Sequence, residues 1–170
     1  MLKITRNVLF LMGLSILLIS ASCEKEDPEP RTREMEMAEL EKKIKDLEAK
    51  GIDIDTTNLS VFYFILKAGE GPYPQDGDSC LVSYIGFLPE GSVFEDSRDI
   101  HPPDGIWRFN YKPPHKITGL VNGIGYMNKG AEIEMFITSD NAYGSKGNAT
   151  VPPFTTLIYR AKMHDLIVLE

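Results

Sequence analysis

Short apolar runs separated by turn residues make up the chain from residue 59 onward, and this pattern restricts the fold more than any other feature. The run Val61-Phe-Tyr-Phe-Ile-Leu66 is β-branched and aromatic, and residues 131–138 alternate apolar and polar side chains as a half-buried strand does. Gly69-Glu-Gly-Pro72 and Pro102-Pro-Asp-Gly105 are typical turn sequences. We therefore expect about five or six strands. The clearest of them span residues 61–67, 80–88, 106–111, 131–138 and 157–169.

One short helix is expected among these strands, over residues 117–126. Strands, a single helix and many turns favour an α+β fold with an antiparallel sheet. A chain of 170 residues has room for one such domain and an appendage, so we place the domain at residues 59–170.

A second, amphipathic helix is predicted ahead of the domain, over residues 34–51. Its apolar residues recur at steps of three and four and form one narrow stripe: Met37, Leu40, Ile44 and Leu47. The stripe allows two interpretations, a helix that docks on the domain or serves as a stalk, and a short coiled-coil dimer seam. Because so short a seam is marginally stable by itself, we expect a monomer.

The first 22 residues have the pattern of an export signal rather than of a folded element. Lys3 and Arg6 precede an apolar run over residues 8–19, which is too short for a comfortable membrane span. Small residues then lead to Cys23, as in a bacterial lipoprotein signal in which residues 1–22 are removed and Cys23 is lipidated. The alternative is an ordinary secretory signal followed by an incidental cysteine.

Residues 23–33 are charged and contain two prolines, so they are interpreted as a tether. The acidic start Glu24-Lys-Glu-Asp27 resembles the surface-export signals of Bacteroidetes lipoproteins, although acidic linkers also occur for solubility alone. We expect a protein of the bacterial cell envelope, anchored in the outer membrane by lipid and facing the periplasm or the cell surface.

Composition and missing motifs exclude several functions. A net charge of −7 without a basic stripe argues against a nucleic-acid partner. The three histidines lack metal-ligand spacing, and neither a P-loop nor a G-x-S-x-G motif is present, so neither a cofactor nor a metal is predicted. With Cys23 lipidated, Cys80 has no disulfide partner; it is expected to be a small buried apolar residue, with a reactive thiol as the alternative.

Four segments occur in a characteristic order: Leu81-Val-Ser-Tyr-Ile-Gly86, Gly91-Ser-Val-Phe-Glu-Asp-Ser97, Asp140-Asn-Ala-Tyr-Gly144 and Val151-Pro-Pro-Phe-Thr-Thr-Leu-Ile-Tyr159. Together, over residues 61–170, they resemble the FKBP-type peptidyl-prolyl isomerases. The resemblance implies a sheet wrapped around the short helix, with an apolar pocket between them. It also implies an isomerase of proline-containing polypeptides and, as further ligands, macrolide inhibitors.

Prolyl isomerisation suits a pocket made of apolar residues. Rotation about the X-Pro bond destroys amide resonance, which for a peptide bond gives a barrier of about 18–20 kcal/mol. A pocket that binds the twisted amide better than either planar form lowers this barrier without a nucleophile or a metal. Such an enzyme carries its signature in aromatic and aliphatic residues, which core packing could also explain.

The resemblance assigns site residues motif by motif. The hydroxyl of Tyr143 and the backbone N–H of Ile117 would bind carbonyl groups, and Lys116 and Val151 would contact the substrate. The catalytic set implied in this way is Tyr84, Phe94, Glu95, Trp107, Ile117, Leu120, Tyr143 and Tyr159.

Three of these residues depart from the family pattern. Leu120 replaces a tryptophan at the pocket floor, Glu95 is one methylene longer than the usual aspartate, and Tyr159 adds a hydroxyl that must be hydrogen-bonded if it is buried. We therefore expect weak or retuned catalysis. Three functions stay open: an isomerase that assists the folding of exported proteins, a proline-segment binding module such as a chaperone, and a structural lipoprotein of an envelope machine that binds through the helix at 34–51.

Overall fold

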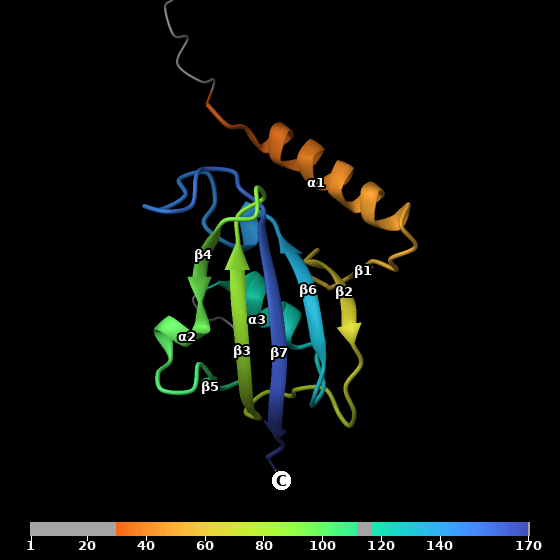
Figure 1. Cartoon of the computed structure of the whole chain (residues 1–170), viewed down its shortest axis with the longest axis vertical. Coiled ribbons are helices and arrows are strands. Elements are labelled where there is room, and N and C mark those ends of the chain that lie inside the picture. The colour runs from red at the N-terminus through yellow and green to blue at the C-terminus, as the bar shows by residue number, and fades with distance from the viewer. Residues whose placement is uncertain (1–29, 112–116, 170) are drawn as a thin grey trace, which may run out of the picture. The chain divides into compact units, whose positions relative to one another are not determined.

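The computed structural model describes residues 30–111 and 117–169, and within them the chain forms one seven-stranded sheet (Figure 1). Every strand pairing is antiparallel, which confirms the predicted α+β class. The strands are β1 (Asp55–Thr56), β2 (Phe62–Lys67), β3 (Ser79–Phe87), β4 (Val93–Asp96), β5 (Trp107–Asn110), β6 (Glu132–Ile137) and β7 (Leu157–Ile167). The helices are α1 (Arg33–Glu48), α2 (Ser97–Ile100), α3 (Thr118–Ile124) and the 3-10 turn η1 (Ser139–Asn141).

The strands follow the order β1-β2-β6-β7-β3-β4, and β5 also pairs with β3. β7 pairs along the whole of one edge of β3, so β4 and β5 share the other edge, one after the other. The chain leaves the sheet between β4 and β5 to form α2. This interruption leaves the middle of β3 without a strand partner at that edge, beside the candidate site.

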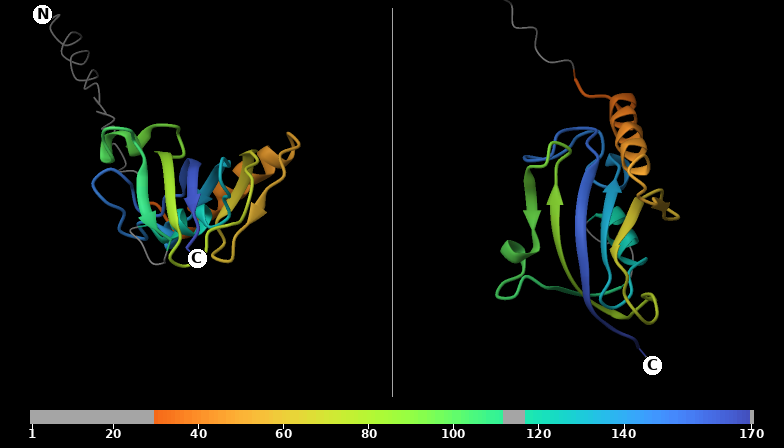
Figure 2. Two further views of the ribbon diagram at one scale, coloured as in Figure 1. Left: turned by 90° about the horizontal axis from the view of Figure 1, so that it is seen from below. Right: turned by 45° about the vertical axis from the view of Figure 1, so that its right-hand side comes forward.

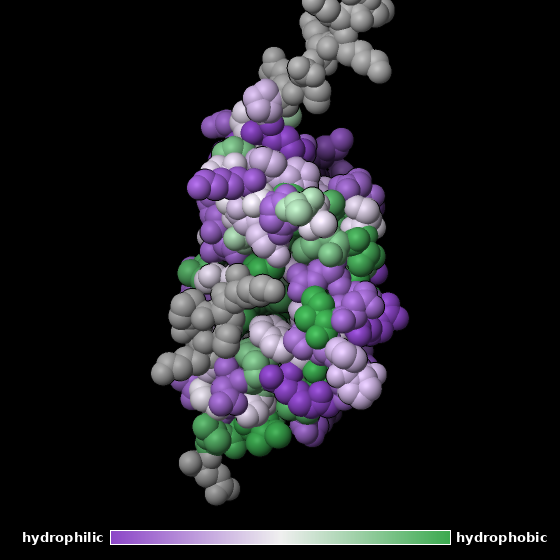
Figure 3. Space-filling model, turned by 90° about the vertical axis from the view of Figure 1, so that its left-hand side faces the viewer, coloured by the Kyte–Doolittle hydropathy of each residue, from purple (hydrophilic) through white to green (hydrophobic). Residues whose placement is uncertain are grey.

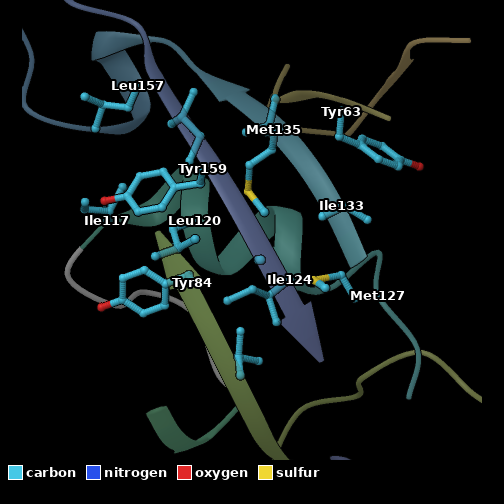
Figure 4. Packing of buried hydrophobic residues seen from close by; sticks show 14 of the residues in the cluster. Tyr63, Tyr84, Ile117, Leu120, Ile124, Met127, Ile133, Met135, Leu157 and Tyr159 are labelled. Atoms are coloured by element: carbon cyan, nitrogen blue, oxygen red, sulfur yellow. The ribbon is translucent and has the colours of Figure 1, made fainter. Parts of the chain in front are cut away.

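The inner face of the sheet packs closely on α3 (Figure 4). Two glycines allow this approach: a Cβ at Gly119 would lie 2.2 Å from Ile137 Cγ2, and one at Gly123 would lie 2.6 Å from the Met135 sulfur. Since real contacts are never so short, larger residues would push the helix off the sheet. The glycines thereby place Leu120, between them in the helix, at a fixed depth.

The outer face of the sheet is partly covered by α1, as the second view in Figure 2 shows. The helix begins after Thr32, whose hydroxyl accepts a hydrogen bond from Met35 N, and Gly51 follows its end with φ of +81°. Leu40 and Leu47 of the predicted apolar stripe are buried against Phe64 and Phe136 of the sheet. The buried part of the stripe is therefore used within the chain, whereas Met37 is exposed.

Strand β6 differs from the half-buried strand that alternation predicts. Both of its faces are buried from Ile133 to Ile137. The reason is α1, which covers Phe136 on the outer face, while the buried carboxylate of Glu134 pairs with Arg160. Three short elements, β1, α2 and η1, were not expected from the sequence, and the sheet has one strand more than the upper expectation.

Cys80 is completely buried, and burial raises the pKa of its thiol to about 12. This agrees with its predicted state as a small apolar residue. Among the described residues, no helix is long and apolar enough to cross a membrane. Residues 1–22, Cys23 and Lys116, which carry the predicted signal, lipid and substrate contact, lie outside the described part of the chain.

Candidate functional site

A pocket of about 130 Å³ opens between β3, β5, α3 and the segment that joins β6 to β7. An apolar cavity of about 150 Å³ can bind a benzene ring, so the pocket is of the size for one proline ring. Its walls carry four aromatic or imidazole rings, three aliphatic side chains and one carboxylate. The lining residues are Tyr84, Glu95, Ile100, His101, Trp107, Ile117, Leu120 and Tyr143.

Three rings packed against one another form the main wall. Trp107 lies edge-on to Tyr84, with ring centroids 6.0 Å apart, and the ring of His101 stacks on Trp107 at 6.2 Å. Tyr84 pairs with β7 on one edge of β3 but has no strand beside it on the other edge, where its backbone N–H donates to the buried hydroxyl of Ser97 at 3.0 Å. The wall is thus held by ring contacts and by a polar substitute for strand pairing.

Glu95 connects two tyrosines that come from neighbouring strands. Its Oε1 accepts a hydrogen bond from the Tyr84 hydroxyl at 2.9 Å, and its Oε2 accepts one from the Tyr159 hydroxyl, also at 2.9 Å. Figure 4 shows both hydroxyls pointing in the same direction. The two departures from the family pattern, Glu95 and Tyr159, therefore satisfy each other, and the buried hydroxyl of Tyr159 is not left without a partner.

The tyrosine hydroxyls of the site are kept protonated. Burial, followed by the negative charge of Glu95, raises the pKa of Tyr84, Tyr143 and Tyr159. Each phenol is therefore a neutral hydrogen-bond donor at physiological pH. Tyr143 also lines the pocket and is half-buried. Neither of the two hydrogen bonds of Glu95 involves it.

The floor and one side of the pocket come from the start of α3. Ile117 is the residue before the helix, with extended backbone angles of −123° and 107°. Leu120 lies one turn later and is 4% exposed, so only a small part of its side chain reaches the pocket.

Three predicted site residues are not part of the lining. Tyr159 and Val151 are almost fully buried, and Phe94 packs edge-on to Tyr159 at 5.7 Å. Gly86 makes room for these rings, since a Cβ there would lie 2.8 Å from Phe94. Substrate cannot touch Tyr159 or Val151 directly in this arrangement, so they can act only through the residues in front of them.

Ile100 and His101 line the pocket but were not predicted from the sequence. Both belong to the excursion around α2, an element that sequence patterns did not reveal. His101 packs on Trp107 six residues later in the chain, and only the folded chain brings the two rings together. The sequence feature that could have indicated this residue was the position of His101 directly before a pair of prolines.

Other hollows of the surface suit a proline ring less well. The groove under α1, about 260 Å³, has an apolar floor that includes Leu40 and Phe136 and a charged rim. A hollow of about 380 Å³ on the outer face is lined largely by charged groups such as Asp96, Arg98 and Arg160. On the side that carries β4 and α2, Figure 3 shows apolar surface broken into small areas among hydrophilic side chains.

The chain combines a curved antiparallel sheet, a short helix and an aromatic pocket between them. Comparison with known families identifies the class of protein that has this arrangement. The family model of the FKBP-type peptidyl-prolyl cis-trans isomerases matches residues 71–164. The match covers more than half of the chain, and the chain belongs to this family.

Curated relatives agree with the family assignment. The isomerase FkpA of Escherichia coli K12 is 29% identical over 139 residues, which are 76% of this chain and 50% of FkpA. A probable FKBP-type isomerase of Haemophilus influenzae is 33% identical over 119 residues, 69% of this chain and 47% of the relative. The chain thus spans about half the length of these relatives.

Solved structures support the same fold. The crystal structure of FkpA from Escherichia coli has a TM-score of 0.58 at 27% identity, covering 77% of this chain and 64% of that one. An isomerase from Pseudomonas syringae has a TM-score of 0.60 and is covered over 96% of its length, together with 78% of this chain, at 23% identity. The second likeness concerns the fold alone.

Proposed function

We propose that this chain catalyses the cis-trans isomerisation of X-Pro bonds in the pocket formed by Tyr84, Trp107, Leu120 and Tyr143. The observation that carries the proposal is this pocket itself, which is apolar, ring-sized and bordered by a protonated tyrosine hydroxyl. Membership of the family supports the same activity.

In the proposed mechanism the residues bind and orient the peptide, and no covalent bond is made. Tyr84, Trp107 and Leu120 surround the proline ring. The Tyr143 hydroxyl and the Ile117 N–H hold substrate carbonyls. A twisted amide has less charge separation than a planar one, so it loses less hydration free energy on entering an apolar site.

Glu95 has a positioning role in this mechanism. Both of its oxygens accept hydrogen bonds from tyrosines, so the carboxylate joins the wall at Tyr84 to the layer behind it at Tyr159. Val151 supports the wall from the core, the partly exposed Phe94 does so by packing on Tyr159, and Lys116 would contact the polypeptide outside the ring pocket.

A second candidate function is the binding of proline-containing segments without useful turnover. The observation in its favour is the floor, where Leu120 contributes little exposed surface and gives a proline ring no aromatic face to pack on. A chaperone or an envelope assembly factor would need such binding and no catalysis.

The setting of the activity is proposed from the N-terminal sequence. Residues 1–22 would be removed as a signal, and lipid on Cys23 would hold the monomer at the outer membrane, where exported polypeptides fold. Labelling of cells with an alkyne fatty acid tests the anchor. Label is expected on the native chain and on Cys80→Ala, and its persistence on Cys23→Ala would contradict the proposal.

The isomerase activity is tested by NMR exchange between the cis and trans forms of an X-Pro peptide, with the full chain added in substoichiometric amounts. Spontaneous exchange takes tens of seconds or longer, so acceleration is readily seen. Tyr143→Phe is expected to lower kcat/KM about tenfold, the effect of one lost hydrogen bond. Acceleration that appears only in Leu120→Trp would favour the binding module, and a folded native chain that neither accelerates exchange nor binds the peptide would contradict both.

A further inference from the structure

The N-terminal helix contributes a buried carboxylate to the segment that carries Tyr143. This segment, residues 138–156 between β6 and β7, is called the pocket loop below. Glu36 of α1 is only 1% exposed, although it lies in the first turn of a surface helix. A buried carboxylate costs free energy unless every oxygen is well bonded, so its partners indicate what it does.

Glu36 bonds to both ends of the pocket loop. Its Oε1 accepts from the backbone N–H of Ser139 at 2.6 Å and from the Thr156 hydroxyl at 3.1 Å. Its Oε2 accepts from the Ser139 hydroxyl at 2.6 Å. Ser139 begins η1 and Thr156 is the last residue before β7, so one side chain closes the loop at its base.

The bonds at Ser139 lead directly to the pocket. The Ser139 carbonyl accepts from the N–H groups of Ala142 and Gly144 at 2.9 and 2.8 Å, and these residues flank Tyr143. Gly144 in turn accepts from Phe154 N at 3.2 Å across the loop. The orientation of the Tyr143 ring therefore depends on the same turn that Glu36 holds.

Two arginines near the start of α1 also contact the pocket loop. Arg33 contacts Glu36 at 3.2 Å and also pairs with Asp140 of η1. Arg31 donates to the carbonyl of Phe154, whose φ of +48° is a left-handed conformation that a phenylalanine adopts only when its surroundings enforce it.

We infer that Glu36 is a positioning residue of the site, which fixes Tyr143 through the base of the pocket loop and makes α1 part of the catalytic unit. Docking of α1 does not require it, because Leu40 and Leu47 already bury the helix against Phe64 and Phe136. The donors that Glu36 satisfies all belong to the loop ends or to Arg33. For the reaction itself, the inference rests on the proposed isomerase function.

The test compares Glu36→Ala with Leu47→Ala in the full chain. Leu47 lies about three turns after Glu36 on α1, in the apolar cluster that includes Leu40, Phe64 and Phe136, so its truncation loosens the helix without removing a loop contact. Hydrogen exchange of the Ala142 and Gly144 amides and kcat and KM for an X-Pro peptide are measured in both variants. Glu36→Ala should speed exchange at these amides about tenfold or more and lower kcat. Leu47→Ala should also lower Tm, because it truncates a buried side chain, but it should change neither the exchange of these amides nor kcat.

Glu36→Gln serves as the conservative variant, because its amide oxygen can still accept from the Ser139 N–H. It should return the exchange rates and kcat toward the native values. Equal exchange rates in the native chain and Glu36→Ala, or the same increase in Leu47→Ala, would overturn the inference. If the native chain shows no isomerase activity the proposed function fails, and the exchange rates still decide whether Glu36 fixes the loop.

Discussion

Two glutamates on opposite sides of the sheet use the same device in different surroundings. Glu95 on the inner side joins the Tyr84 and Tyr159 hydroxyls, and Glu36 on the outer side joins Ser139 to Thr156. Each carboxylate uses its two oxygens to connect two elements of the pocket. Glu95 is partly exposed in the pocket, whereas Glu36 is buried where α1 meets the pocket loop, so losing Glu36 should have the larger effect on stability.

The largest expected effect is that of Glu36→Ala on stability. It leaves the buried Ser139 N–H and the Ser139 and Thr156 hydroxyls without their acceptor, whereas Arg33 keeps its pairing with Asp140, and losing these buried hydrogen bonds to a charged group should cost about 3 kcal/mol. Urea unfolding followed by circular dichroism measures the change. Glu41→Ala is the control, because that carboxylate is exposed and pairs with Lys45 on the same helix. Similar unfolding midpoints for the two variants would show that Glu36 has no special role.

Gly119→Ala tests how closely the inner face is packed. The added methyl would meet Ile137 at 2.2 Å, and overpacking of this kind costs about 1–3 kcal/mol. Because Leu120 is the next residue, the pocket floor should also move and peptide affinity should fall. Gly130→Ala is a matched control with open space around the new methyl, although its positive φ adds a smaller backbone cost. An unchanged unfolding midpoint in Gly119→Ala would contradict the packing described here.

Tyr159→Phe tests how much the hydrogen bond between Tyr159 and Glu95 stabilises the inner side. It removes one of the two hydrogen bonds of Glu95 and should cost about 1 kcal/mol. In a double-mutant cycle with Glu95→Ala the two losses should not add, since both remove the same contact. Additive losses would mean that the contact between Glu95 and Tyr159 contributes nothing to stability.

Alkaline pH should lower the free energy of unfolding, and the first buried group of the inner side to contribute should be the thiol of Cys80. The folded state raises the pKa of Cys80 to about 12, whereas a free thiol titrates near pH 8.5. Stability is therefore complete below about pH 8.5 and falls as the pH rises toward the folded value. The raised pKa of Tyr84 and Tyr159 adds a second loss above about pH 10. Urea midpoints across this range should decline less in Cys80→Ala, and equal slopes would contradict the assignment.

Much of the inner side could be predicted from the sequence. Strand runs, turns and ordered motifs located β3, β7, α3 and the residues Tyr84, Trp107, Leu120 and Tyr143, which the fold brings to one pocket. These features are local, or repeat a pattern that the family shares. The hydrogen bond between Glu95 and Tyr159 could not be predicted, because it depends on one side chain contacting residues of two different strands in the folded chain.

The outer side was less predictable. The pattern of α1 indicated an apolar stripe, and Leu40 and Leu47 do pack on the sheet. Nothing in the helical pattern separates the buried Glu36 from the exposed Glu39 or Glu41, since a glutamate in the first turn also suits the helix dipole. The contacts of Glu36 span more than a hundred residues of sequence, and the burial of both faces of β6 follows from the same long-range docking.

The central claim is that proline peptides enter the pocket beside Tyr143. A titration of the isotope-labelled full chain with an X-Pro peptide, followed by amide and indole NMR shifts, tests it most directly. The account predicts that the largest shifts occur at the Trp107 indole, Leu120 and Tyr143. Shifts confined to the groove under α1, at Leu40 and Phe136, would contradict it.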